Sequence, residues 1–178
     1  TPHQNLVSEG VAAEDKPDIE ALMQDRALVE GTISKLRQNS MACVALPTCG
    51  LAMAESERYL PELVTKLERL LESKGLADEP ITVRMSGCPN GCSRPYVAEI
   101  GLTGRAPGKY NLYLGGGFHG QRLNRMIREN VGEQTILDVL DEVLTRFAKE
   151  RGEDERFGDF CIRAGIVREV TEGRHFND

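Results

Sequence analysis

The sequence predicts a mixed α/β (α+β) fold, in which a sheet carries helices on at least one face. Two stretches favour helices, because residues 61–75 and 133–152 each repeat apolar side chains at intervals of three and four. Three others favour strands, since residues 81–87, 97–102 and 109–116 are rich in β-branched and apolar side chains and are separated by turn-forming residues. With 178 residues, the chain is long enough for one sizeable domain or two small ones.

Weaker patterns predict the remaining elements. In chain order they are a strand at 5–11, a helix at 17–28, an extension of the 61–75 helix back to Leu51, a helix at 122–130, and a strand at 158–170. Pro61 marks a kink or a restart within the extended helix, because proline has no amide proton to donate. Gly75 is where that helix is expected to stop.

Charge and hydropathy exclude two classes of function. The net charge of −6 argues against general nucleic-acid binding, and no apolar run approaches the length of a membrane span. Residues 81–130, however, hold seven basic and two acidic side chains, a net +5, together with nine of the eighteen glycines. This distribution indicates a surface that receives an anion at close backbone range. The alternative is a set of turns with solvated arginines.

Four of the five cysteines form two close pairs. Five residues separate Cys43 from Cys49, and three separate Cys88 from Cys92. The N-terminus has neither the basic start nor the apolar stretch of an export signal, so reduced thiols or metal ligands are favoured over a disulfide framework. Cys161, next to Phe160 and Ile162, is interpreted as a structural core thiol.

The spacing of the pairs favours an iron–sulfur cluster over zinc. Four thiolates can hold either, but zinc knuckles usually place two to four residues between paired cysteines, which fits only the second pair. Both pairs are accompanied by residues that fix turns and admit backbone close to sulfur, namely Pro47, Gly50, Gly87, Pro89 and Gly91. Zinc remains the second interpretation, and disulfides the third.

Longer motifs around the cysteines carry a family resemblance. "NSMACVALPTCGLAMAESERYLP" and "RMSGCPNGCSRP" resemble the sirohaem-containing sulfite and nitrite reductases, and more closely the sulfite reductase hemoproteins. "TPHQNL", "APGKYNLYLGG" and "FGDFCIRAGIVREV" extend the resemblance over essentially the whole chain. The resemblance implies the C-terminal lobe of that fold and about the last third of a longer hemoprotein. Residues 1–40 would end a preceding strand–helix unit, and residues 41–178 would form the cluster and sirohaem domain.

The resemblance also implies specific ligands. In this family the motif cysteines hold the iron of a [4Fe–4S] cluster, here Cys43, Cys49, Cys88 and Cys92. Cys92 would in addition supply the proximal thiolate of the sirohaem iron and so bridge the two cofactors at the catalytic centre. Asn90 and Gly91 would lie against the macrocycle, and Gln4 would contact it from the start of the chain. Gly50 departs from the family, whose members often have proline there.

The activity implied is the six-electron reduction of sulfite to sulfide. The partners implied are sulfite, the N-terminal part of the same hemoprotein, and an electron donor, either an NADPH-dependent flavoprotein or ferredoxin. The compartment implied is the cytoplasm, or the plastid in a plant. Because the family's basic substrate-binding residues come from the N-terminal part, this segment alone is expected to be inactive. The alternatives are a nitrite reductase, a stand-alone cluster module for electron transfer or redox sensing, and a zinc-stabilised structural domain.

Overall fold

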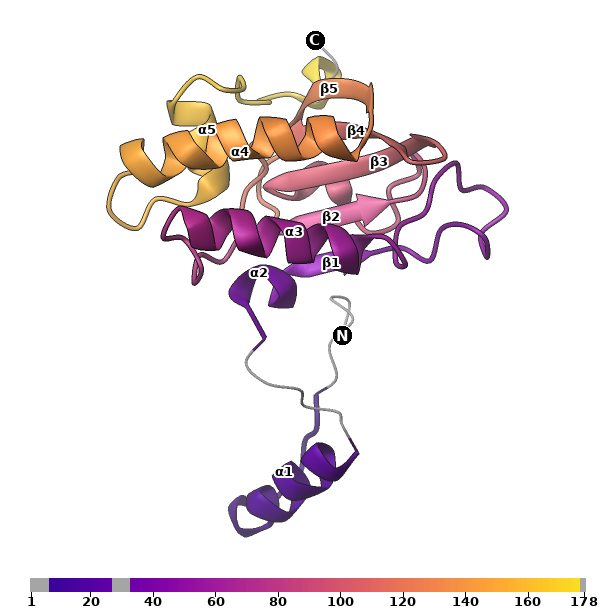
Figure 1. The fold of residues 1–178 in the computed structure, drawn as a ribbon, viewed down its shortest axis with the longest axis vertical. Helices are drawn as coiled ribbons and strands as arrows, with labels where there is room; N and C mark the ends of the chain where they lie inside the picture. Colours follow the sequence, from indigo (N-terminus) through magenta and orange to yellow (C-terminus); the bar gives the residue numbers. More distant parts are fainter. Residues whose placement is uncertain (1–6, 27–32, 177–178) are drawn as a thin grey trace.

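The structure is a computed structural model that describes residues 7–26 and 33–176. Its helices are α1 (Lys16–Asp25), α2 (Lys35–Gln38), α3 (Leu60–Ser73), α4 (Glu133–Glu150) and α5 (Phe157–Arg163). Its strands are β1 (Ser40–Ala42), β2 (Val83–Ser86), β3 (Ile100–Ala106), β4 (Lys109–Leu114) and β5 (Arg125–Val131). Short 3-10 turns are η1 (Ala13–Asp15), η2 (Pro95–Val97) and η3 (Gly173–His175). The predicted mixed α/β fold is confirmed (Figure 1).

The strands form one sheet in the order β1-β2-β3-β4-β5. β1 pairs with β2, and β2 with β3, in parallel, whereas β3, β4 and β5 are joined by antiparallel pairing. Adjacent parallel strands end at the same edge of a sheet. The first cysteine pair begins directly after β1, and the second begins two residues after β2. The sheet topology therefore brings together two loops that lie some forty residues apart in the sequence.

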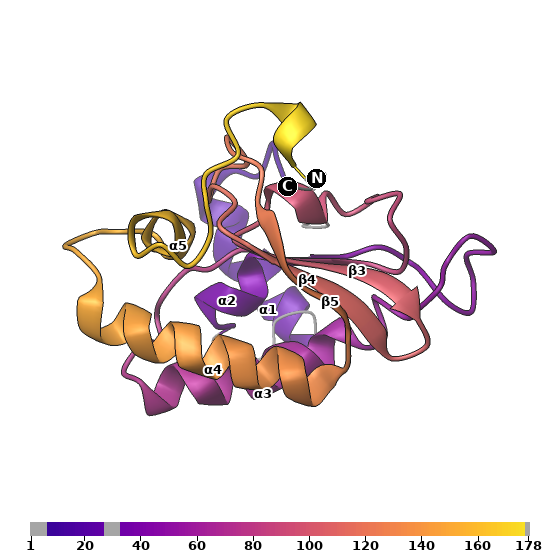
Figure 2. The ribbon, with the colours of Figure 1, turned by 90° about the horizontal axis from the view of Figure 1, so that it is seen from above.

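One face of the sheet packs against α3 and α4. Figure 2 shows both helices on the same side of the sheet, with the C-terminal segment on the other side. The buried core combines leucines of both helices with the apolar side chains of the strands, including Leu63, Leu67, Leu71, Leu140, Leu144, Val83, Met85, Leu102 and Leu112. Ion pairs of 2.6 Å join the helices at their rims, from Lys66 Nζ to Glu133 Oε1 and from Lys74 Nζ to Asp141 Oδ1.

The opposite face of the sheet is polar but mostly covered. Side chains alternate between the two faces of a strand, and those opposite the helix-packed core residues include Arg84, Ser86, Thr103, Asn111 and Tyr113, all of them buried. The Tyr113 ring contacts the ring of Tyr96 edge-on at 5.4 Å and stacks on that of Phe176 at 6.0 Å. The segment around η2 and the end of the chain therefore cover this face.

Five of the predicted elements are confirmed in type. They are α3, β2, β3, β4 and α4, which match the predictions at 61–75, 81–87, 97–102, 109–116 and 133–152 to within a few residues. The described part of the predicted 17–28 helix is also helical, as α1. Cys161 is fully buried, as expected of a core thiol, and burial raises its pKa. Among the described residues, no helix is long and apolar enough to cross a membrane.

Three predictions are wrong, two of them in the second half of the chain and one just before α3. Residues 122–130 contain β5 rather than a helix, because pairing with β4 overrides their helix-compatible pattern. Within 158–170 the chain forms α5, not a strand, since Phe157, Phe160 and Cys161 bury one helical face. Residues 51–59 form turns, and the helix begins only at Leu60 with Pro61 in its first turn.

The predicted N-terminal strand is also wrong where it can be compared. Residues 7–11 have no regular structure, and residues 5 and 6 lie outside the described part of the chain. Helix α1 buries none of its residues, and Figure 1 shows it apart from the sheet. Its apolar side chain Leu22 is exposed, so among the described residues α1 contributes no buried side chain to the core.

A buried carboxyl group joins three parts of the fold. Glu99 is fully buried, and its carboxylate accepts hydrogen bonds of 2.9 Å from the backbone N–H groups of Thr82 and Gly158. It therefore links the chain before β2, the start of β3 and α5. Burial raises the pKa of Glu99 to about 7, although these hydrogen bonds and the charge of Arg156 oppose the rise.

This shift predicts a pH-dependent stability. The folded pKa of about 7 lies above the ordinary value of 4.5, so the stabilisation from protonated Glu99 is fully present below pH 4.5 and is lost as pH rises to about 7. The loss amounts to roughly 3 kcal/mol. Urea unfolding of wild type and Glu99→Gln between pH 4.5 and 8 measures it: the unfolding free energy of wild type should fall relative to the variant as pH rises. A constant difference, as expected for the exposed control Glu153→Gln, would contradict the prediction.

Candidate metal centre

All four paired cysteines line one cavity at the end of β1 and β2. Its volume is about 320 Å³, or roughly ten times the share of one water molecule in the liquid. The lining thiols come from both loops, namely Cys43, Cys49, Cys88 and Cys92. The expectation that the two pairs surround a common space thus agrees with the geometry, whereas Cys161 lies in the core on α5.

The first cysteine loop is anchored where it leaves β1. The backbone N–H of Cys43 donates to the carbonyl of Met85 at 3.1 Å, and the carbonyl of Cys43 accepts from the N–H of Glu57 at 3.1 Å. Ala45 has a left-handed backbone (φ +49°), and its carbonyl accepts from the N–H of Cys49 at 2.7 Å. A non-glycine residue in this conformation stores strain. Here Ala45 forms part of the turn between Cys43 and Cys49, both of which line the cavity.

The two loops pack together through glycines. The carbonyl of Gly87 accepts from the N–H groups of Met53 and Ala54 at 2.8 and 3.0 Å. A Cβ atom at Gly87 would lie 2.4 Å from the Cβ of Ala45 and 2.6 Å from the carbonyl oxygen of Ala54. One at Gly104 on β3 would lie 2.3 Å from the Gly87 carbonyl oxygen. Both positions therefore require glycine because another backbone passes too close for a side chain.

The two cysteines of the second loop differ in exposure. Cys88 is 7% exposed, whereas Cys92 is exposed. Gly91 adopts φ +69° and turns the chain between them. The loop returns to β2 through Ser93, whose N–H donates to Ser86 Oγ at 3.2 Å and whose hydroxyl donates to the Met85 carbonyl at 2.7 Å. Cys92 therefore lines the cavity and is also exposed to solvent.

The surroundings of the thiols favour negative charge. The backbone N–H of Gly87 donates to Cys43 Sγ at 3.2 Å, a type of bond that stabilises a metal-bound thiolate. Arg84 on β2 is almost fully buried, and burial together with the positive charge of nearby Arg94 lowers its pKa. In the sequence, Arg84 precedes Cys88 by four residues and Arg94 follows Cys92 by two, so both positive charges belong to the segment that carries the second cysteine pair.

The donor set and the cavity fit an iron–sulfur cube. Four thiolates are the usual ligands of such a cluster, and here they surround a cavity with room for a group of several atoms. Among the described residues, no group of three or more His, Cys, Asp or Glu side chains is arranged to hold a metal ion. The support for a cluster of several atoms is the cavity itself, which four thiols from two loops line.

The other sequence-predicted residues have different outcomes. Asn90 is exposed and lines the cavity, and Gly91 lies half-buried in the turn beside it. Gln4 lies outside the described residues. Sequence reasoning missed Gly104, although a glycine inside a strand is a known signal of close backbone approach. It also missed an apolar rim, formed by Val44 and Leu51, which line the cavity, and by Met53, two residues after Leu51. These three side chains are 43%, 71% and 40% exposed in that order.

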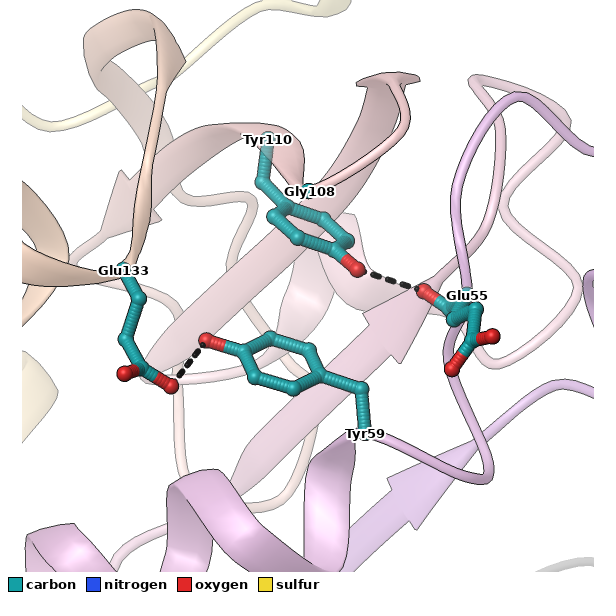
Figure 3. A pocket seen from close by; sticks show the side chains of 5 residues that line it. All are labelled: Glu55, Tyr59, Gly108, Tyr110 and Glu133. Atoms are coloured by element: carbon teal, nitrogen blue, oxygen red, sulfur yellow. Dashed lines mark hydrogen bonds between the residues drawn. The ribbon is translucent and has the colours of Figure 1, made fainter.

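A second cavity, of about 310 Å³, is lined by Glu55, Tyr59, Gly108, Tyr110 and Glu133 (Figure 3). Ala52 lines the cysteine cavity, whereas Glu55 lines this one. The Tyr110 hydroxyl donates to the Glu55 carbonyl at 2.8 Å, and the Tyr59 hydroxyl donates to Glu133 Oε2 at 2.9 Å. The two tyrosine rings stack at 5.5 Å, and burial raises the pKa of both hydroxyls. These contacts tie the segment after the first cysteine pair to β4 and α4.

Comparison with known families agrees with this geometry. The family described as "Nitrite and sulphite reductase 4Fe-4S domain" matches residues 34–172, which include the sheet and both cysteine loops. The chain belongs to this family. Members of the 4Fe-4S domain family are named for the cluster that the cysteine spacing predicts, and the resemblance seen in the sequence is confirmed.

Individual relatives include sulfite reductase hemoproteins and one solved structure. The chain is 69% identical to the sulfite reductase [NADPH] hemoprotein beta-component of Nitrosomonas europaea and 70% identical to that of Afipia carboxidovorans. Each comparison covers 100% of this chain but 31% of the relative, so the chain spans about a third of the length of these curated relatives. The solved structure of the Mycobacterium tuberculosis NirA protein matches with a TM-score of 0.73 and 32% identity, over 92% of this chain and 32% of that one.

Proposed function

We propose that this 4Fe-4S domain holds a [4Fe–4S] cluster on its four paired cysteines, as the C-terminal part of a sulfite reductase hemoprotein. One observation carries the proposal: two loops from adjacent parallel strands place all four thiols around one cavity. Identity of about 70% to sulfite reductase hemoproteins supports sulfite over nitrite as the substrate. The reaction proposed for the intact protein is the six-electron reduction of sulfite to sulfide.

Cys92 is proposed to ligate sirohaem as well as the cluster. Its exposed thiol, beside the exposed Asn90, supports a contact with a group that lies outside this domain. When bound, the cluster and the sirohaem supply the electron storage and the metal centre for the reduction. The chain's own contribution is to place the Gly87 N–H against Cys43 Sγ, to fix the two loops, and to keep Cys88 away from water.

The rest of the hemoprotein is proposed to cover the cysteine cavity. The apolar rim of Val44, Leu51 and Met53 is exposed here and lies in the first cysteine loop. We assign residues 41–178 to the cofactor domain and residues 1–40 to the end of a preceding unit, which agrees with the unburied α1. The relatives' name, with NADPH in it, supports an NADPH-dependent flavoprotein as the electron donor rather than ferredoxin. Their bacterial sources favour the cytoplasm over a plastid.

Sulfide formation tests the proposed function. The intact hemoprotein that carries this segment should release one sulfide per sulfite when reduced, with a higher kcat/KM for sulfite than for nitrite. The 178-residue chain alone should release none, because it spans about a third of the length of these relatives and the basic residues that bind sulfite are proposed to belong to the N-terminal part of the hemoprotein. Sulfide formation by the chain alone would contradict the proposal that sulfite binds to the N-terminal part. A higher kcat/KM for nitrite than for sulfite would make nitrite the substrate.

A further inference from the structure

The exposed half of the second cysteine loop rests on a tyrosine. The Tyr96 hydroxyl donates to the carbonyl oxygen of Pro89 at 2.6 Å. Its ring lies against Gly91, where an added Cβ would be 2.8 Å from Tyr96 Cε2. Tyr96 therefore contacts the loop at two points, both of them between Cys88 and Cys92.

The tyrosine is itself held from the opposite side. Its ring meets those of Tyr113 and Phe176 edge-on, at centroid distances of 5.4 and 5.3 Å. Its backbone carbonyl accepts from the N–H of Asn124 at 2.8 Å. Tyr96 is thus fixed to β4 and to the segment before β5, and its contacts with Pro89 and Gly91 restrain the loop.

The middle of the loop is exposed, and a backbone hydrogen bond there, from the N–H of Arg94 to the carbonyl of Gly91 at 2.7 Å, stays within the loop segment. Cys88 lies two residues after the end of β2, and Ser93 returns the chain to β2 through Ser86. Pro89 and Asn90 are exposed, and Gly91 is the most permissive residue for backbone motion. Movement in these residues would shift Cys92 relative to the other three thiols.

We propose that Tyr96 is a positioning residue for Cys92, through its hydrogen bond to Pro89 and its ring contact with Gly91. The inference rests on the proposed function, because it assumes that Cys92 is a cluster ligand. Tyr96 does not touch the cluster in this account. It fixes the turn that carries Cys92, and with it the position of the Cys92 sulfur relative to the other three cavity thiols.

Substitutions in the intact hemoprotein test this role. Tyr96→Phe removes the hydroxyl and keeps the ring, whereas Tyr96→Leu removes both contacts. Tyr96→Phe should still bind the cluster but should lose iron to a ferrous chelator about fivefold faster, because it loses the hydrogen bond to the Pro89 carbonyl that holds the loop. Tyr96→Leu should lose iron faster still, with a changed electron paramagnetic resonance spectrum of the reduced cluster.

Tyr113→Phe is the matched control. The Tyr113 ring contacts that of Tyr96. Its hydroxyl oxygen, however, lies 3.4 Å from Thr103 Oγ1 and from Asn111 Nδ2, which belong to the sheet and not to the second cysteine loop. Its iron-release rate should stay within about twofold of wild type. Equal rates for wild type and both Tyr96 variants, or equal acceleration by Tyr113→Phe, would overturn the inference alone. An intact wild-type protein without a cluster would overturn the proposed function, and the inference with it.

Discussion

Replacing Cys88 with serine is expected to remove the cluster from the intact protein. Cys88 is the most buried of the four cavity thiols, so water cannot readily take the place of the lost sulfur ligand. Iron is held in such clusters by soft thiolate ligands, and a serine hydroxyl is a poor substitute. Iron beyond that of the haem, and acid-labile sulfide, should both fall to less than about a tenth of the wild-type amount.

Cys161 provides the control for this prediction. It is the same residue type and is fully buried, but it lies on α5 within the core and does not line the cavity. Cys161→Ala should leave the iron and sulfide content unchanged and lower the free energy of unfolding by about 1 kcal/mol. If Cys161→Ala lost the cluster while Cys88→Ser retained four irons, the assignment of ligands would be wrong.

Replacing Gly87 with alanine is expected to separate the two cysteine loops. The new methyl group would lie 2.4 Å from the Cβ of Ala45 and 2.6 Å from the carbonyl oxygen of Ala54, and backbone cannot give way cheaply. Overpacking of this kind destabilises a fold, so the unfolding free energy should fall by about 3 kcal/mol. Cluster content should fall with it, because the Gly87 N–H also donates to Cys43 Sγ.

Gly50→Ala is the matched substitution for the Gly87 test. Gly50 lies in the first cysteine loop, directly after Cys49, but an added Cβ there would meet no atom within 4 Å. Its unfolding free energy should stay within about 0.5 kcal/mol of wild type, and its cluster content should not change. Urea unfolding and iron analysis of both variants measure the difference. Wild-type stability and iron content in Gly87→Ala would show that the loops do not need their close contact.

The candidate site can be predicted from the sequence because its chemistry is local. The two cysteine pairs, with glycine and proline around them, indicate a four-thiolate site through residue type and spacing alone. The strand that leads into Cys88 is also readable, as β-branched residues that end at Ser86. The shared cavity additionally depends on β1 and β2 being adjacent and parallel, which is a property of the sheet and not of either motif.

Elements that depend on distant partners cannot be predicted in the same way. β5 carries a helix-compatible pattern and becomes a strand only because β4 offers its edge. The α5 segment is easily mistaken for a strand because a short apolar run fits either structure, and its helical form is selected by burial of Phe157 and Phe160. Tyr96 has no sequence signal, since its importance comes from contacts with Pro89 and Gly91 that only the folded loop creates.

Binding of one [4Fe–4S] cluster by four cysteines from two loops can be measured directly. The measurement is a visible absorption spectrum of the chain purified without oxygen, with iron, zinc and acid-labile sulfide assayed on the same sample. We expect a brown protein with about four irons and four sulfides per chain, apart from any haem iron. A colourless chain that carries one zinc ion and no acid-labile sulfide would contradict it.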